Sequence, residues 1–244
     1  MGRRARHALS ALISAALSAS LLAGCAGKPP VISRVFAQPI LVRDLRGGDL
    51  SEKLSVFIVA SDPDGMEDLE AFYIINDQAE LFWKVEKAAW MELKAEGESW
   101  IGTNALAVPA YEPLPAGEFR IVMQDTAGET AEQSFVLPEK RPSAADASYP
   151  SLSAKDGVIS VRSSFPNPQI WVYDASGKFM FSLNAGAGGA APEGGAAATI
   201  EVARIVATLP NPSQAFALWV YAREAAGTYA VMCGPYASET LSPK

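Results

Sequence analysis

Short segments rich in β-branched and aromatic residues fill the chain between residues 31 and 137, with Gly, Pro, Asp and Asn between them. This is the pattern of strands joined by turns. In one segment, Phe119, Ile121 and Met123 alternate with residues facing the other way, as in a strand with one buried face. The predicted strands are residues 31–37, 54–60, 69–75, 81–85, 99–108, 119–124 and 133–137. About seven strands in roughly 100 residues predict a sandwich of two antiparallel sheets.

Two turns in this region have a specific chemistry. Residues 61–65 read Ser-Asp-Pro-Asp-Gly, and the last four suit a type I turn. Residues 125–128 read Asp-Thr-Ala-Gly and suit a type I turn followed by a left-handed glycine. The first turn together with Phe-Tyr-Ile at residues 72–74 resembles the B–C region of bacterial immunoglobulin-like or fibronectin-type-III-like domains, and residues 115–129 resemble their F–G hairpin. The resemblance implies an immunoglobulin-like β-sandwich over residues 31–137 but no activity, because such folds host many functions.

The chain after this region divides into a linker and a second set of strands. Residues 138–153 are polar and contain three prolines, which predicts an interdomain linker. Further strands are predicted at residues 158–162, 169–173, 179–183, 199–208, 215–221 and 228–233. Residues 154–238 are therefore expected to form a second β-sandwich-like domain. Within it, residues 185–198 are nearly all Ala and Gly and predict a mobile loop, with a helix over residues 196–209 as the alternative.

The second region contains two similar segments. Residues 165–173 place Phe-Pro-Asn-Pro before Trp-Val-Tyr, and residues 209–221 place Leu-Pro-Asn-Pro before Trp-Val-Tyr. Each is a proline-marked entry to a hairpin, which fits either an internal repeat or convergent hairpin chemistry. Trp171 and Trp219 are expected to pack on core faces.

The N-terminus has the layout of an export signal. Three arginines in the first six residues precede an apolar run over residues 8–22, which small residues close. The run is too short to cross a bilayer comfortably, since a spanning helix needs about 20 apolar residues.

The four residues Leu22-Ala23-Gly24-Cys25 resemble a bacterial lipobox. The resemblance implies that residues 1–24 are removed and that Cys25 carries acyl chains such as palmitate. Two or more chains anchor a protein stably, because each buried CH₂ contributes about 0.8 kcal/mol. Residues 25–30 would then be a lipidated tether that holds the first domain close to the membrane. The alternative is an ordinary secreted protein.

The mature chain that this signal predicts has no histidine, because the single histidine of the sequence is His7. This excludes Ser-His-Asp and Cys-His nucleophiles as well as histidine-ligated metal sites. Cys233 is the remaining cysteine, and its apolar setting predicts a buried thiol rather than a reactive one. Without the signal the chain has 17 basic and 27 acidic residues, a net charge of −10, which argues against nucleic acid as a partner.

Trp83 and Trp90 are candidates for an interaction surface. They lie in a charged stretch within residues 79–100, so one of the two indoles is expected to be exposed. The alternative prediction for residues 79–95 is a helix instead of strands.

A cluster of acidic residues is a candidate calcium site, because calcium prefers carboxylate and carbonyl oxygens. The candidate ligands are Asp62, Asp64, Glu67 and Asp68. Their spacing departs from that of an EF-hand loop, and the alternative is a solvated turn. No other metal or cofactor is expected.

These observations predict an all-β protein with two immunoglobulin-like sandwich domains in tandem after a lipoprotein signal peptide. The expected role is binding or structural, through a partner protein of the cell envelope, and not enzymatic. The anchor would place the chain on the cell membrane or outer membrane, facing the periplasm or the exterior. The alternatives are a calcium-dependent adhesion module and a histidine-free hydrolase, which needs two carboxylates about 5–10 Å apart in one cleft.

Overall fold

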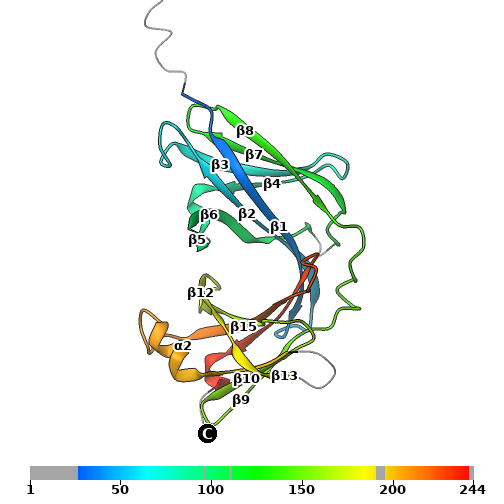
Figure 1. Cartoon of the computed structure of the whole chain (residues 1–244), viewed down its shortest axis with the longest axis vertical. Coiled ribbons are helices and arrows are strands. Elements are labelled where there is room, and N and C mark those ends of the chain that lie inside the picture. The colour runs from blue at the N-terminus through cyan, green and yellow to red at the C-terminus, as the bar shows by residue number, and fades with distance from the viewer. Residues whose placement is uncertain (1–26, 96, 110–111, 191–195, 242–244) are drawn as a thin grey trace, which may run out of the picture.

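The computed structural model describes residues 27–95, 97–109, 112–190 and 196–241 (Figure 1). Within them the regular secondary structure is almost entirely β-strand, and the strands form three sheets. This confirms the predicted all-β fold. The predicted signal peptide and Cys25 lie outside the described residues.

The first sandwich consists of two four-stranded layers. Its strands are β1 (Val31–Asp44), β2 (Leu50–Ser61), β3 (Leu69–Asn76), β4 (Leu81–Glu86), β5 (Met91–Ala95), β6 (Glu98–Leu106), β7 (Gly117–Asp125) and β8 (Thr130–Leu137). One layer has the order β1-β2-β6-β5 and the other has the order β4-β3-β7-β8. Lettered in chain order as A, B, C, C′, D, E, F and G, the layers are ABED and C′CFG, the immunoglobulin-type arrangement.

The second sandwich repeats the same arrangement. Its elements are β9 (Ser151–Lys155), β10 (Val158–Ser163), β11 (Gln169–Asp174), β12 (Phe179–Asn184), β13 (Gly186–Ala190), β14 (Ala196–Glu201), helix α2 (Val202–Thr208), β15 (Phe216–Arg223) and β16 (Ala230–Ala237). Its layers have the orders β9-β10-β14-β13 and β12-β11-β15-β16. The prediction of two immunoglobulin-like sandwiches is therefore confirmed.

Each sandwich has its own core. In the first, alternate residues of β7, Phe119, Ile121 and Met123, are fully buried, as their alternation predicts. In the second, Ile170 and Val172 of β11 pack with residues of β10, β14 and β15. Burial of such apolar side chains is the main stabilising contribution in both halves.

Both predicted turns are present. The Gly65 N–H donates to the Asp62 carbonyl at 3.1 Å, and the Gly128 N–H donates to the Asp125 carbonyl at 3.2 Å. Gly128 has a φ of 86°, the left-handed conformation that the hairpin requires.

The structure corrects two local predictions. Residues 186–190 and 196–198 of the predicted mobile loop belong to the paired strands β13 and β14, and Ala198 is buried in the second core. Small residues give a loop-like composition, but backbone hydrogen bonds of a ladder need no side-chain bulk. The helix alternative for residues 79–95 is also wrong, because this stretch forms β4, a 3₁₀ turn and β5. The helix alternative for residues 196–209 is confirmed in part, because α2 covers residues 202–208.

The two sandwiches share one sheet. Residues Ile40–Asp44 of β1 pair in parallel with Ala230–Gly234 of β16. This pairing joins four strands from each sandwich into one eight-stranded sheet, in the order β12-β11-β15-β16-β1-β2-β6-β5. The two sandwiches follow each other in the sequence, but they are joined by this shared sheet and not only by the linker.

The segment between β8 and β9 is packed against this joint. The side chains of Arg141 and Glu52 form an ion pair with an Nη2–Oε2 distance of 3.1 Å. Tyr149 packs against the cluster of Leu41, Ala222 and Val231 and donates its O–H to the Ala144 carbonyl. The predicted linker residues thus contribute to the folded structure.

Candidate binding groove

The eight-stranded sheet curls so that its two edge strands, β5 and β12, face each other across an opening (Figure 1). The other two sheets lie on the outer side of the curl. A groove follows the inner side, bordered by Met91 and Leu93 of β5 and by Phe179 and Ser182 of β12. Its volume is about 780 Å³ toward one end and about 1250 Å³ toward the other.

The groove is aromatic because strands in its floor are apolar on both faces. In β15, Leu218 and Val220 enter the second core, whereas Trp219 and Tyr221 lie on the opposite, inner face. A strand covered on both faces reads as a continuous apolar run.

Aromatic rings of the second sandwich contact one another along this face. The rings of Trp171 and Tyr221 are stacked, with centroids 4.5 Å apart and an interplanar angle of 14°. Phe179 lies edge-on to Trp171 and to Tyr173, at 5.7 and 5.6 Å. Tyr173 in turn contacts Trp219. The ladder pairs Trp171 directly with Trp219, so the two Trp-Val-Tyr segments are neighbouring antiparallel strands.

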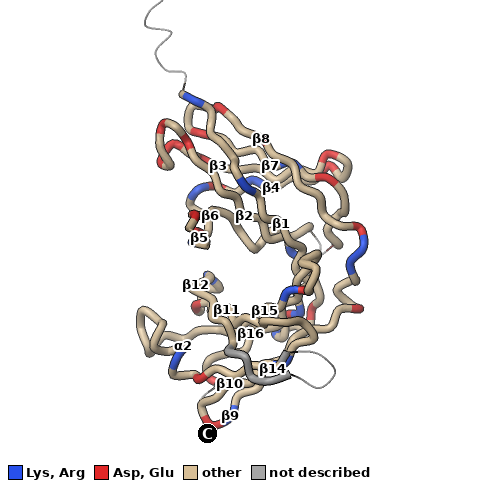
Figure 2. The backbone as a smooth tube through the Cα atoms, in the orientation of Figure 1, with Lys and Arg blue, Asp and Glu red and all other residues tan. Residues whose placement is uncertain are grey.

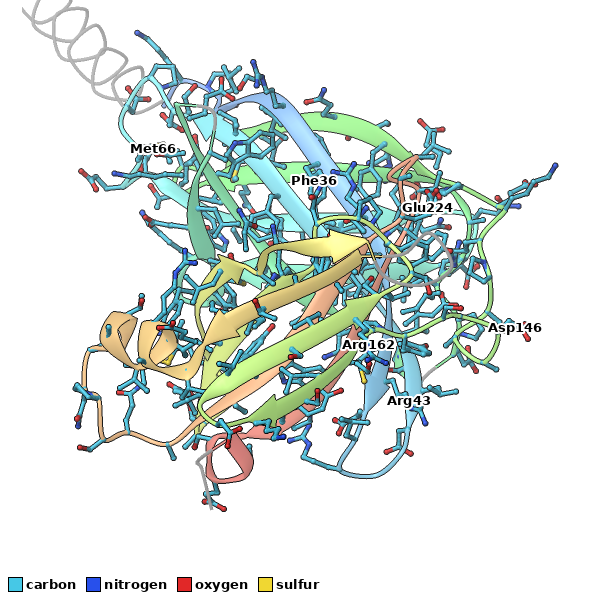
Figure 3. The ribbon with its side chains drawn as sticks, turned by 60° about the horizontal axis from the view of Figure 1, so that its bottom comes forward. Phe36, Arg43, Met66, Asp146, Arg162 and Glu224 are labelled. Atoms are coloured by element: carbon cyan, nitrogen blue, oxygen red, sulfur yellow. The ribbon has the colours of Figure 1, made fainter. Side chains whose placement is uncertain are left out.

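The opposite wall comes from the first sandwich. Phe36, Phe57 and Trp100 line the same end of the groove as Trp171 and Tyr221, and we call these five residues the aromatic end. Phe36 of β1 and Glu224, which follows β15, are labelled in Figure 3, and both line this end. The Trp100 Nε1–H is buried and has no hydrogen-bond partner among the described residues.

The floor of the groove also has fixed polar groups. The Gln38 side chain is buried, accepts the Tyr221 O–H and donates to the Gly227 carbonyl at 3.1 Å. Burial raises the pKa of Tyr221 to about 12, so this phenol stays protonated at neutral pH. The guanidinium carbon of Arg223 lies 5.7 Å from the centre of the Phe36 ring, a cation–π contact.

The wider end of the groove is lined by basic side chains. Arg46, Lys53, Lys94 and Lys178 line it, and we call these four residues the basic end. Three acidic residues, Glu92, Asp174 and Glu239, lie there as well, so the local balance is +1 on a chain with a net charge of −7. Burial lowers the pKa of Lys53, whose ammonium is only partly hydrated.

Trp83 and Trp90 lie at the margin of the first core. Both are half-buried and pack against it, and their indole N–H groups donate to the carbonyls of Ala107 and Val85, each at 3.0 Å. Trp90 also lines the basic end of the groove. The most exposed large apolar residue described in this stretch is Phe82, which is 67% exposed.

The structure brings together part of the predicted acidic cluster. Carboxylate oxygens of Asp62, Asp68 and Asp125 lie within 4.8 Å of one another. Asp64 is exposed and accepts the Lys28 backbone N–H at 2.6 Å, and Glu67 is exposed. Asp125 follows these residues by more than 50 positions, so local spacing could not identify it.

Cys233 is buried, and burial raises the pKa of its thiol. Its Sγ lies 3.6 Å from the Tyr236 hydroxyl. These features agree with a structural thiol.

Sequence reasoning missed the groove because its walls come from strands far apart in the chain. Trp171 and Trp219 were expected on core faces, and Trp219 is indeed buried in an apolar cluster that Trp171 packs against, but this cluster lies on the inner face of the shared sheet and is separate from the cores of the two sandwiches. The sequence did contain one indication of the groove. β15 is an uninterrupted apolar run, whereas a strand with one solvent-exposed face alternates apolar and polar residues.

Within the part of the chain that the structure describes, no helix is long and apolar enough to cross a membrane. The sequence matches no protein-family model, and no curated protein matches it. Among solved structures, the chain is similar to Tp47, the 47-kilodalton lipoprotein of Treponema pallidum, with a TM-score of 0.31 and 9% identity over 85% of this chain and 51% of that one. It is similar to dimeric latent PorU from Porphyromonas gingivalis, with a TM-score of 0.31 and 13% identity over 86% of this chain and 20% of that one. The chain thus spans about half of the former protein and a fifth of the latter.

Proposed function

We propose that this chain is a lipid-anchored protein of the cell envelope that binds an extended segment of a partner protein in the groove between its two sandwiches. The observation that carries the proposal is the arrangement of β5 and β12, two edge strands of one sheet that border the same groove. The proposed role is binding, not catalysis.

The two edges supply backbone hydrogen-bonding groups. Among the described strands, β5 pairs only with β6, and β12 pairs only with β11. An edge strand presents unpaired N–H and C=O groups, and extended peptides bind such edges by adding a strand. A segment entering between β5 and β12 meets a free edge on either side.

The aromatic end supplies apolar contact. A bound strand directs alternate side chains to the floor of the groove. Trp171 and Tyr221 already stack on each other, and Gln38 fixes the Tyr221 hydroxyl, so they lose little conformational freedom on binding. Large, rigid aromatic side chains of this kind dominate the binding energy of protein interfaces.

The basic end supplies direction. Lys53, Lys94 and Lys178 line it together with Arg46, which pairs with Asp44, and burial lowers the pKa of the half-buried Lys53 ammonium. We therefore expect a segment with apolar residues at alternate positions and acidic residues toward one end, because charge complementarity orients a ligand.

The predicted anchor at Cys25 places the partner in the same compartment. The described chain begins only two residues after Cys25, and Lys28 is already hydrogen-bonded to the first sandwich. A short tether keeps the groove near the membrane surface. The partner proposed is accordingly an envelope protein on the cell membrane or outer membrane.

Photo-crosslinking in intact cells tests this function. A photoreactive amino acid replaces Leu93 on β5 or Phe179 on β12, and the crosslinked peptides are identified by mass spectrometry. The matched control position is Val136, which is apolar, 70% exposed and on the edge strand β8 of another sheet. The expected result is that positions 93 and 179 crosslink to one contiguous segment of one protein and position 136 does not.

Binding of that segment completes the test. A synthetic peptide of the identified sequence should bind the purified full chain, and Trp171→Ala should weaken binding by about tenfold or more, as for a buried aromatic anchor. Crosslinks from positions 93 and 179 to unrelated proteins, or unchanged peptide affinity in Trp171→Ala, would overturn the proposal.

A further inference from the structure

We propose that Asp62, Asp68 and Asp125 form a calcium site at the end of the first sandwich where the chain emerges from its tether. Asp62 and Asp68 lie in the turn between β2 and β3, and Asp125 ends β7. Met66, labelled in Figure 3, marks this turn, and Figure 2 shows its acidic residues beside the start of the described chain. The site lies outside the groove and is independent of the proposed function.

Two buried carboxylate oxygens at this place lack any partner. Asp125 is completely buried, and its Oδ2 has no hydrogen-bond partner among the residues that the structure describes. Asp62 Oδ2 is likewise inaccessible and unpartnered. A buried carboxylate oxygen without a donor or a cation is strongly unfavourable, and here two belong to the same cluster. A bound cation would satisfy both.

In each of the three carboxylates, the Oδ1 atom accepts a hydrogen bond. Asp62 Oδ1 accepts the Asp64 backbone N–H, and Asp125 Oδ1 accepts the Glu129 backbone N–H, each at 2.7 Å. Asp68 Oδ1 accepts the Thr126 hydroxyl. These bonds fix the three side chains, so the Oδ2 atoms remain for another ligand.

The spacing suits calcium. One oxygen from each of Asp62, Asp68 and Asp125 lies within 4.8 Å of the others. Oxygens bound to one Ca²⁺ at 2.3–2.6 Å are at most roughly 4.6–5.2 Å apart, twice the bond length. Mg²⁺ requires near-ideal octahedral geometry and gives up its waters reluctantly, so a site made only of protein carboxylates suits it less well.

One positive charge beside this turn is held by backbone carbonyls and not by the three carboxylates. The Lys87 ammonium donates to the carbonyls of Met66 and Glu67, at 3.0 and 2.9 Å. Among the described ion pairs, none includes Asp62, Asp68 or Asp125. Within the described part of the chain, the three carboxylates therefore have no ion-pair partner.

The site would fix the first sandwich to its tether. A Cβ placed on Gly27 would lie 3.5 Å from Asp64 Oδ2 and 3.7 Å from Asp125 Oδ2, so the tether backbone passes over the cluster. A cation here would hold the β2–β3 turn, the end of β7 and the covering tether in one arrangement.

Calorimetric titration of the purified full chain with Ca²⁺ tests the proposal, with Mg²⁺ as the comparison ion. The expected result is one Ca²⁺ per chain with a Kd of about 10⁻³ M or tighter, the range of extracellular calcium modules and below. Asp125→Asn should weaken binding at least tenfold, because Asn keeps the acceptor for Glu129 but removes the free anionic oxygen. The matched control Glu70→Gln removes a neighbouring exposed charge and should change the Kd less than threefold.

Thermal unfolding in a chelator separates a metal site from a structural carboxylate. Without metal, Asp125→Asn should unfold at or above the wild-type temperature, because an unpaired buried charge is gone. A lower Tm of Asp125→Asn in chelator would indicate a structural carboxylate and overturn the proposal. Absence of Ca²⁺ binding up to 10 mM, wild-type affinity in Asp125→Asn, or Mg²⁺ binding as tightly as Ca²⁺ would also overturn it.

Discussion

Arg141 and Glu52 form a buried ion pair that ties the segment between the sandwiches to β2. The Nη2 and Oε2 atoms are 3.1 Å apart, and the side chains are 8% and 7% exposed. Glu52 also accepts the Leu114 backbone N–H at 3.0 Å, and Arg141 donates to the carbonyls of Pro138 and Leu114. One charge pair therefore holds three chain segments together.

Removal of Arg141 should destabilise the protein strongly. Arg141→Ala leaves the buried Glu52 carboxylate without its counter-ion, and we expect a loss of about 3–5 kcal/mol in the free energy of unfolding. Urea unfolding followed by tryptophan fluorescence measures it. The control is Arg120→Ala, which removes a more exposed pair with Asp77 and Glu132 and should lose about 1 kcal/mol or less. Equal losses in the two variants would contradict the structural role of Arg141.

Gly102 should not tolerate a side chain. A Cβ on this residue of β6 would lie 2.1 Å from the Val56 carbonyl oxygen and 2.7 Å from the Phe57 Cα, both backbone atoms. Gly102→Ala must therefore displace β2, and we expect it to lower the free energy of unfolding by about 1–3 kcal/mol. Ser99→Ala, at an exposed position of the same strand, should stay within about 0.5 kcal/mol of wild type. A neutral Gly102→Ala would show that β2 and β6 are less closely paired.

The half-buried phenol of Tyr221 should make stability fall in alkali. Burial raises the pKa of Tyr221 from 10.0 to about 12, so the folded chain keeps a proton that the unfolded chain loses. Its contribution is complete below pH 10 and is lost as the pH rises toward 12, with a slope of up to about 1.4 kcal/mol per pH unit. Urea titrations between pH 9 and 12 should show a shallower decline in Tyr221→Phe than in wild type. Parallel declines would contradict burial of this hydroxyl.

The Cys233 thiol should be unreactive in the folded protein. It is buried and its pKa is raised by burial, so little thiolate is present or accessible. In a Cys25→Ser variant, a chromogenic disulfide reagent at pH 8 should modify Cys233 slowly, and in full within minutes of adding denaturant. Rapid modification without denaturant would instead identify a reactive thiol.

Local features were predictable from the sequence. The turns at residues 62–65 and 125–128 have the predicted hydrogen bonds, because Asp, Pro and Gly set turn geometry locally. The alternation of Phe119, Ile121 and Met123 identified a one-sided strand, because side chains of a strand alternate between two faces.

Long-range features were not predictable. Ile40 pairs with Ala230 across 190 positions, and no local signal indicates a parallel partner so distant. The same pairing creates the groove, so its aromatic walls could not be assigned beforehand. Asp125 joins Asp62 only because the ends of β2 and β7 meet at one end of the sandwich.

The most direct test of the central claim is hydrogen exchange with and without the crosslinked partner peptide. If the segment adds a strand between the two sheet edges, amides of both β5 and β12 should become protected on binding, and those of β8, an edge strand of another sheet, should not change. Protection of neither strand, or of β8 instead, would contradict binding between the two edges.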